Sequence, residues 1–311
     1  MTTRHLVDPE LVPLLDLYPT VTITSENLQE LRDRQVPLPG VEHSGVDWHE
    51  QVIEGPETPL RVRIYRPREA RGELGCIFHI HGGGFVGGNL AEVEFLHRPL
   101  AAELVCMIVT VDYRLAPETP FPGNIEDCYS ALAWTFANAA DLGIDAKRIG
   151  LMGESAGGGL AAALALLARD RGEYPIKFQH LVYPMLDDRT CVREQNPYAG
   201  EFVWSHANNL FGWTSLLGEK PGGRDVSQFA APARATDLQG LPPTFIGTAA
   251  LDLFVDENID FAARLVRAGV PTELHVWPGA FHGFDLVPGY RVSDGARRTS
   301  IDALSAFLRG K

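Results

Sequence analysis

The hydrophobic positions of this chain follow two different patterns. Residues 46–53 and 60–65 alternate apolar and polar side chains, which is typical of exposed antiparallel strands, and Gly55-Pro56 between them indicates a turn. From Cys76 onward the apolar residues instead form short continuous runs, as in strands buried on both faces. These runs predict strands at 76–80, 105–111, 149–152, 178–183 and 244–247, followed by a last strand at 272–277.

Segments with helical character alternate with the buried strands. The sequence predicts helices at about 92–103, 123–140, 156–170, 256–268 and 295–309. Alternation of helices with near-continuous apolar strands is typical of a parallel sheet whose two faces are both covered by helices. The fold class expected from the pattern is therefore α/β.

Two segments do not follow this alternation. The first forty or so residues contain five prolines among short apolar clusters, which predicts one or two helices with kinked connections. Residues 186–228 are rich in aromatic side chains but contain no run that extends the sheet, as expected of a lid or binding insertion. We expect residues 1–45 and 186–228 to form a two-part cap over the strand ends, on a core made of residues 46–185 and 229–311.

Composition and charge narrow the classes of function. The chain has 311 residues, 45% of them hydrophobic, and a net charge of −13, so a nucleic-acid or anionic-membrane partner is not expected. It contains no apolar stretch of membrane-spanning length and no signal-peptide core near Met1. Its 4 cysteines are isolated in the sequence, which favours reduced thiols and a cytoplasmic location. The sequence leaves the oligomeric state open, a homodimer included.

The clearest candidate for chemistry is Ser155. Gly153-Glu154-Ser155-Ala156-Gly157 fits the GxSxG nucleophile elbow, and it stands between the strand predicted at 149–152 and the helix predicted at 156–170. The strained turn exposes the serine oxygen at a helix N-terminus, where developing negative charge is favoured. The motif alone arises by chance in about one such chain in ten. Its strand–turn–helix context favours a nucleophile over an ordinary glycine-rich loop.

A serine nucleophile needs a base, and the base needs an acid that orients it. His282 lies in a loop just after the last predicted strand, whereas three other histidines fall inside predicted strands, where a core or sheet-face role is expected. Asp252 follows the strand at 244–247, and the order Ser155, Asp252, His282 is the one that α/β-hydrolases use. Asp256 and Glu257 fall at the start of the next helix, where capping and the helix dipole already explain carboxylates.

The sequence also predicts an oxyanion hole. His81-Gly82-Gly83-Gly84-Phe85 directly follows the strand at 76–80, and the N–H groups of Gly83, Gly84 and Ala156 are the expected donors. Gly82, Gly84 and Gly87 also fit a dinucleotide-binding fingerprint. That alternative places the fingerprint on the third strand instead of the first and leaves Ser155 and His282 unexplained. Metal-binding signatures are absent from the sequence.

Taken together, these motifs resemble those of the hormone-sensitive-lipase-like carboxylesterases. The resemblance runs from about residue 46 to the C-terminus and is carried by His81–Gly84, Val111–Glu118, Gly153–Gly158, Leu251–Asp252 with Asp256–Glu257, and Phe281–Phe284. It implies an α/β-hydrolase fold with an eight-stranded, mostly parallel sheet, a two-part helical cap, no cofactor and hydrolysis of short acyl esters. It also implies that residues 113–118 brace the oxyanion loop. Glu154 replaces the commoner aspartate of the family, and Leu253 replaces its usual proline.

The resulting hypothesis is a carboxylesterase that hydrolyses small-molecule esters of short, acetyl-like acids through an acyl-enzyme. Bulky aromatic side chains are candidate walls of a short pocket, although packing within the cap explains any single one equally well: Phe85, Phe202, Trp204, Phe211 and Trp213. A small-ligand receptor is one alternative, and the presence of His282 argues against it. An amidase on the same scaffold is another, and the sequence leaves amide turnover open.

Overall fold

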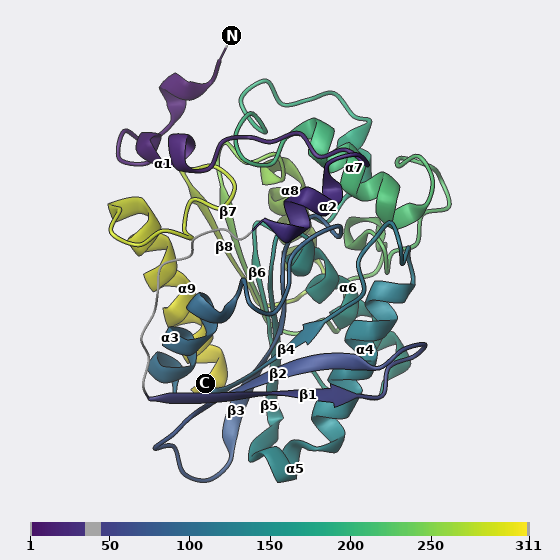
Figure 1. Cartoon of the computed structure of the whole chain (residues 1–311), viewed down its shortest axis with the longest axis vertical. Coiled ribbons are helices and arrows are strands. Elements are labelled where there is room, and N and C mark those ends of the chain that lie inside the picture. The colour runs from purple at the N-terminus through teal and green to yellow at the C-terminus, as the bar shows by residue number, and fades with distance from the viewer. Residues whose placement is uncertain (1, 35–44, 310–311) are drawn as a thin grey trace.

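The computed structural model describes residues 2–34 and 45–309, which contain one eight-stranded sheet (Figure 1). The strand order is β1-β2-β4-β3-β5-β6-β7-β8. β1 pairs antiparallel with β2, and β2 antiparallel with β4, whereas all the other neighbours are parallel. The strands are β1 (Val46–Ile53), β2 (Leu60–Pro67), β3 (Leu74–Ile80), β4 (Met107–Asp112), β5 (Ile144–Glu154), β6 (Gln179–Val182), β7 (Thr244–Ala249) and β8 (Thr272–Trp277).

Helices cover both faces of the sheet, as the apolar runs predict. One face carries α3 (Glu94–Leu104) and α9 (Arg291–Arg309), and the other carries α4 (Gly123–Ala137), α6 (Ala156–Arg171) and α8 (Val255–Arg267) (Figure 1). Side chains of β4 alternate between the two cores: Ile108 packs with the α3 and α9 side chains, and Val109 packs with those of α4 and α6. Both positions are fully buried. Neither face of such a strand contacts water, so both sets of alternating side chains are apolar and the sequence forms an unbroken apolar run.

Several element boundaries differ from the expected ones, and three of these differences have a clear local reason. β4 begins only at Met107, because Val105 adopts a left-handed conformation (φ 48°) that ends α3. The helix predicted at 123–140 is divided at Asn138 into α4 and the short α5 (Ala139–Leu142). β5 begins at Ile144, five residues before its predicted start at 149. The apolar pattern did not indicate this first half, because it is partly exposed.

The two segments outside the strand–helix alternation lie beyond the same end of the sheet (Figure 1). The first holds η1 (Arg4–Leu6), α1 (Val12–Leu17) and α2 (Leu28–Asp33), and the second holds η2 (Asp188–Cys191) and α7 (His206–Leu217), with η3 (Pro232–Arg234) just after it. They contact each other, since the Asn208 amide accepts from the Ile23 N–H at 2.9 Å and donates to the Val21 carbonyl at 2.8 Å. Of the predicted cap and core segments, residues 1, 35–44 and 310–311 lie outside the described residues.

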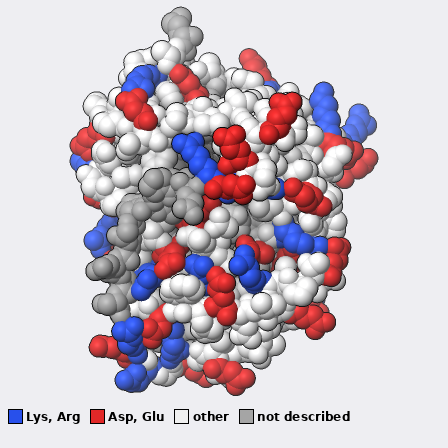
Figure 2. All heavy atoms as spheres, in the orientation of Figure 1, with Lys and Arg blue, Asp and Glu red and all other residues white. Residues whose placement is uncertain are grey.

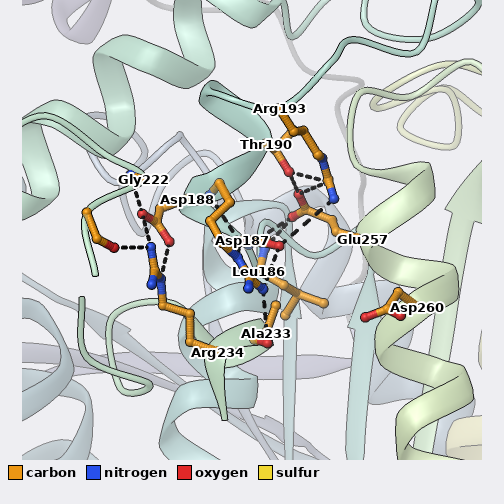
Figure 3. A network of polar contacts seen from close by, with 12 residues as sticks. Leu186, Asp187, Asp188, Thr190, Arg193, Gly222, Ala233, Arg234, Glu257 and Asp260 are labelled. Atoms are coloured by element: carbon orange, nitrogen blue, oxygen red, sulfur yellow. Dashed lines mark hydrogen bonds and ion pairs between the residues drawn. The ribbon is translucent and has the colours of Figure 1, made fainter. Parts of the chain in front are cut away.

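A buried polar network attaches the second segment to α8 (Figure 3). The Glu257 carboxylate accepts from the N–H groups of Leu186 (2.6 Å) and Asp187 (3.2 Å), and also from the Thr190 hydroxyl. Glu257 is 2% exposed. Glu257 lies in the first turn of α8, as predicted. It does not cap that helix, however, because α8 has no side-chain cap hydrogen bond and the Glu257 side chain contacts the neighbouring segment instead. An ion pair also holds this segment: Arg234 Nε, in η3, lies 2.6 Å from Oδ1 of Asp188, in η2.

The molecular surface is charged with both signs (Figure 2). On the face shown in Figure 2, basic side chains are interspersed among acidic ones and form no continuous basic patch. Within residues 2–34 and 45–309, no helix has the length and apolar character needed to cross a membrane.

Candidate active site

Ser155 occupies a strained turn between β5 and α6. Its backbone has φ 56° and ψ −122°, and a non-glycine residue adopts a positive φ only at an energetic cost. The turn is compressed, because a Cβ on Gly153 would collide with the backbone of Gly157, and one on Gly157 would collide with the Ile80 carbonyl. Glycine at both flanks is therefore a steric requirement. Ser155 therefore occupies a turn that a glycine-free sequence could not form.

Three side chains from distant parts of the sequence form one hydrogen-bonded chain. His282 Nε2 lies 3.0 Å from Ser155 Oγ, and His282 Nδ1 lies 2.7 Å from Asp252 Oδ2. Asp252 is 1% exposed, and its Oδ1 accepts from the Phe254 N–H at 3.0 Å, which fixes the carboxylate. With Asp252 accepting from Nδ1–H, the lone pair of Nε2 points to the serine hydroxyl. This arrangement suits Nε2 to take the proton of Ser155.

The predicted oxyanion loop approaches Ser155 from the end of β3. Gly83 (φ 115°) and Gly84 (φ 62°) both adopt conformations that favour glycine. A Cβ on Gly83 would collide with the Gly87 backbone, and one on Gly84 would collide with the Trp204 ring. The Gly83 carbonyl accepts from Gly87 N–H at 2.9 Å, which closes the loop. Ala156 is the first residue of α6, so the helix itself offers its N–H no partner.

Residues 113–118 contact this loop at two points. The Tyr113 hydroxyl donates to the His81 carbonyl at 2.9 Å, and its ring stacks on the His81 ring at 4.3 Å. The Ala116 N–H donates to the Phe85 carbonyl at 2.9 Å. Burial lowers the pKa of His81 to about 4, so this imidazole is neutral near pH 7. These contacts hold both ends of the loop, as expected of a structural support.

Arg32 on α2 is a further support that sequence reasoning missed. Its guanidinium donates to the carbonyls of Val86 (2.7 Å) and Ala116 (2.8 Å) and pairs with Glu118 at 2.8 Å. It thereby joins the N-terminal segment to the oxyanion loop and its brace. No motif surrounds Arg32 in the sequence, so only the folded structure identifies it.

Glu154, the residue before the nucleophile, pairs with a buried histidine. Its Oε2 lies 2.8 Å from His79 Nε2, and His79 Nδ1 lies 3.2 Å from the Thr110 hydroxyl. His79 is fully buried in β3, as its position in a predicted strand indicates. The contact links the strand that carries the serine to the strand that carries the oxyanion loop.

A cavity of about 340 Å³ opens onto Ser155, His282 and residues 82–84. Its walls come from both predicted cap segments and from the core. The other main lining side chains are Tyr18, Asn89, Glu92, Phe95, Leu96, Glu154, Tyr183, Trp204 and Leu286. Of the five aromatic walls expected from the sequence, only Trp204 is among the described residues that line this cavity.

The structure places the other four expected wall residues elsewhere. Phe85 and Trp213 pack against each other at 5.1 Å in the main core, both at most 1% exposed. Phe202 packs on Phe281 at 6.0 Å in a separate cluster, and Phe211 packs on the small cluster around Leu28. These aromatics stabilise the segments around the cavity instead of lining it. Tyr18, Phe95 and Tyr183 line it, and no sequence motif distinguishes them.

The described residues contain no group of three or more His, Cys, Asp or Glu side chains placed to hold a metal ion.

Comparison with known proteins relates nearly the whole chain to esterases. Residues 77–286 match a family described as the α/β-hydrolase fold. The carboxylesterase NlhH of Mycobacterium tuberculosis is 35% identical over 293 residues, covering 90% of this chain and 89% of that protein. The arylacetamide deacetylase of Bos taurus is 32% identical over 288 residues, covering 72% of each. A solved structure of a bacterial heroin esterase is 39% identical, with a TM-score of 0.92 over 99% of this chain and 100% of its own.

Proposed function

Because the chain belongs to the hormone-sensitive-lipase-like branch of the α/β-hydrolase family and is a carboxylic ester hydrolase, we propose that it cleaves short-chain acyl esters through a covalent acyl-enzyme on Ser155. The observation that carries this proposal is the continuous contact from Asp252 to His282 (2.7 Å) and from His282 to Ser155 (3.0 Å). Ser155 and His282 line the cavity, beside glycine N–H groups suited to an oxyanion, and Asp252 is buried against His282.

In the proposed acylation step, Ser155 Oγ bonds to the ester carbonyl carbon while its proton passes to His282 Nε2. The carbonyl electron pair moves onto oxygen, and the N–H groups of Gly83, Gly84 and Ala156 stabilise the resulting oxyanion. When the carbonyl re-forms, the bond to the alcohol oxygen breaks and His282 gives its proton to the departing alcohol. Asp252 holds the imidazole tautomer and stabilises its charged form. Water then attacks the acyl-enzyme in the same way and releases the carboxylic acid.

We also propose that residues 1–45 and 186–228 act as a two-part cap that limits the acyl chain. Support comes from Tyr18 in the first segment and Trp204 in the second, which both line the cavity. The Trp204 ring also lies against Gly84, where it restricts the space beside the predicted oxyanion hole. A space bounded by these side chains suits acetyl to about hexanoyl groups better than long chains.

The direct test is turnover of p-nitrophenyl acetate by the purified protein. We expect steady release of p-nitrophenol far above a heat-inactivated control, with none above that control from Ser155→Ala. The absence of turnover in folded wild-type protein would refute the proposed activity and favour a small-ligand receptor.

Amide hydrolysis is a second candidate, favoured by one observation: the similarity to a protein named arylacetamide deacetylase. The same serine chemistry applies, with His282 protonating a departing amine instead of an alcohol. Release of p-nitroaniline from p-nitroacetanilide would establish it, and its absence beside rapid ester turnover would restrict the enzyme to esters.

A further inference from the structure

The charged side chains other than histidine that line the cavity are acidic. Glu154 and Glu92 are among its lining residues, and no Lys or Arg occurs among the described residues that line it. Of its two histidines, His81 is neutral near pH 7, because burial lowers its pKa to about 4, and His282 belongs to the proposed triad. In a cavity with low-dielectric walls, charges of one sign concentrate ligands of the opposite sign.

The Glu154 carboxylate is held in place while only half of it is paired. Its Oε2 is fixed by His79 Nε2 at 2.8 Å. Its Oε1 is buried and has no hydrogen-bond partner within residues 2–34 and 45–309. An unpaired buried oxygen leaves the carboxylate incompletely compensated, so a cation that enters the neighbouring cavity gains an interaction that water does not supply there.

Aromatic rings complete the surroundings. Tyr18, Phe95, Tyr183 and Trp204 line the same cavity. The Tyr183 ring centroid lies 4.6 Å from that of His282, and the Trp204 centroid lies 6.4 Å from it, so these two rings flank the reacting groups. Aromatic faces beside a carboxylate are the surroundings that proteins use to bind alkylated ammonium groups, which are too weakly hydrated to require many hydrogen bonds.

From these observations we propose that the preferred substrates are esters that carry a tertiary or quaternary ammonium group, and that Glu154 is the residue that selects them. The proposal rests on the proposed esterase function and specifies its substrate class. A primary ammonium is less suitable, because it would lose three hydrogen bonds to water in a cavity whose walls are mainly apolar. The alkylated cation needs only the negative field and the aromatic faces.

The experiment compares two acetate esters of the same shape, acetylcholine and 3,3-dimethylbutyl acetate, which differ only in a charged nitrogen or a neutral carbon. Acid release is titrated near neutral pH, and the readout is the ratio of the two kcat/KM values in one enzyme preparation. In the wild type we expect acetylcholine to be preferred about tenfold, the size of one desolvated cation–aromatic or cation–carboxylate contact.

Three variants locate the effect. Glu154→Gln keeps an oxygen for His79 but removes the charge, so we expect the ratio to fall about fivefold or more. Glu92→Gln, at a half-buried position bonded to Asn89 at 2.8 Å, should lower the ratio by a smaller factor. The control is Glu126→Gln, which removes the same charge from α4, where Glu126 pairs with Arg171 at 2.6 Å. It should leave the ratio at the wild-type value.

Two results would overturn the inference. One is hydrolysis of both esters by the wild type without preference for the charged one. The other is an equal loss of both activities in Glu154→Gln, with the ratio unchanged, in protein whose circular dichroism shows it to be folded. Failure of the esterase proposal itself is distinguishable, because the neutral ester would then be cleaved no faster by the wild type than by Ser155→Ala.

Discussion

Asp252 and Asp256 are four residues apart in the sequence, yet they differ in burial and in the groups that they contact. Asp252 is buried and contacts both His282 and the Phe254 N–H, whereas Asp256 is exposed and lies 3.4 Å from the Asn196 amide. The surroundings decide the role of each carboxylate, and residue type alone does not. They also make the pair a matched test of the proposed triad.

We predict opposite effects of the two amide substitutions. Asp252→Asn offers His282 Nδ1 the wrong partner, so kcat should fall about 10³–10⁴-fold while the melting temperature changes little. Asp256→Asn removes a charge from the first turn of α8 and should lower stability by about 0.3–1 kcal/mol, with kcat within about tenfold of wild type. Inactivity of Asp256→Asn beside normal turnover by Asp252→Asn would show that the acid has been misassigned.

Gly84 provides a second test at this scale. Its φ of 62° and the nearby Trp204 ring leave no room for a methyl group, so Gly84→Ala should displace the proposed oxyanion donor. We expect kcat for short esters to fall about 10²–10³-fold, the cost of losing one such donor. Gly87→Ala is the control within the same loop, since a Cβ there meets its nearest neighbour at an ordinary 3.6 Å. Equal activities of the two variants would contradict the assignment.

The reacting residues could be predicted from the sequence, whereas the cavity walls could not. GxSxG, the triple glycine and the order of Ser155, Asp252 and His282 identify residues whose local conformation requires a particular residue type, and the structure brings these residues together. The cavity walls have no such local requirement. Phe85 and Tyr183 are both aromatic residues beside site loops, and only tertiary packing sends one into the core and the other to the cavity.

At the scale of elements, the attachment of the second cap segment to α8 is the feature with a measurable pH dependence. Burial raises the pKa of Glu257 to about 8 from its ordinary 4.5, and the hydrogen bond from Thr190 offsets this in part. The folded state therefore holds the proton more tightly than the unfolded state does. As a consequence, the Glu257 contribution to the free energy of unfolding falls as pH rises from about 4.5 to about 8.

Glu257→Gln should remove this contribution, because the amide keeps an acceptor for the Leu186 N–H but does not titrate. We predict that the fall in melting temperature between about pH 5 and pH 8 is smaller in Glu257→Gln than in the wild type. Asp260→Asn is the control on the same helix, with an aspartate side chain that is 62% exposed, and should follow the wild-type profile (Figure 3). Parallel profiles for all three proteins would refute this account of Glu257.

At this scale, continuous burial makes a strand predictable from an apolar run. β3 and β7 are buried along their whole length and were found as apolar runs, whereas the exposed first half of β5 was not. The eight-stranded, mostly parallel sheet followed from the family resemblance and is confirmed. Arg32 and Glu257 attach the two outer segments to the core through polar contacts that leave no periodic signal in the sequence.

At the scale of the whole molecule, the sheet presents loops from β3, β5, β7 and β8 at one end, and the two outer segments cover that end (Figure 1). The cavity between them is about 340 Å³ and is bounded by Trp204 and Tyr183. We therefore predict that kcat/KM for p-nitrophenyl esters is highest between acetyl and about hexanoyl chains. Hydrolysis of the palmitoyl ester faster than the butyryl ester would show that the cavity accepts long chains.

The most direct test of the central claim is covalent labelling by a fluorophosphonate, followed by mass spectrometry of the digested protein. Phosphonylation requires an activated serine, so the proposed chain from Asp252 through His282 predicts one equivalent of label, on the peptide that contains Ser155. Ser155→Ala, folded to the same melting temperature, should take up no label and release no acid from an acetate ester. Label on a different serine, or ester turnover that persists in Ser155→Ala, would contradict the account.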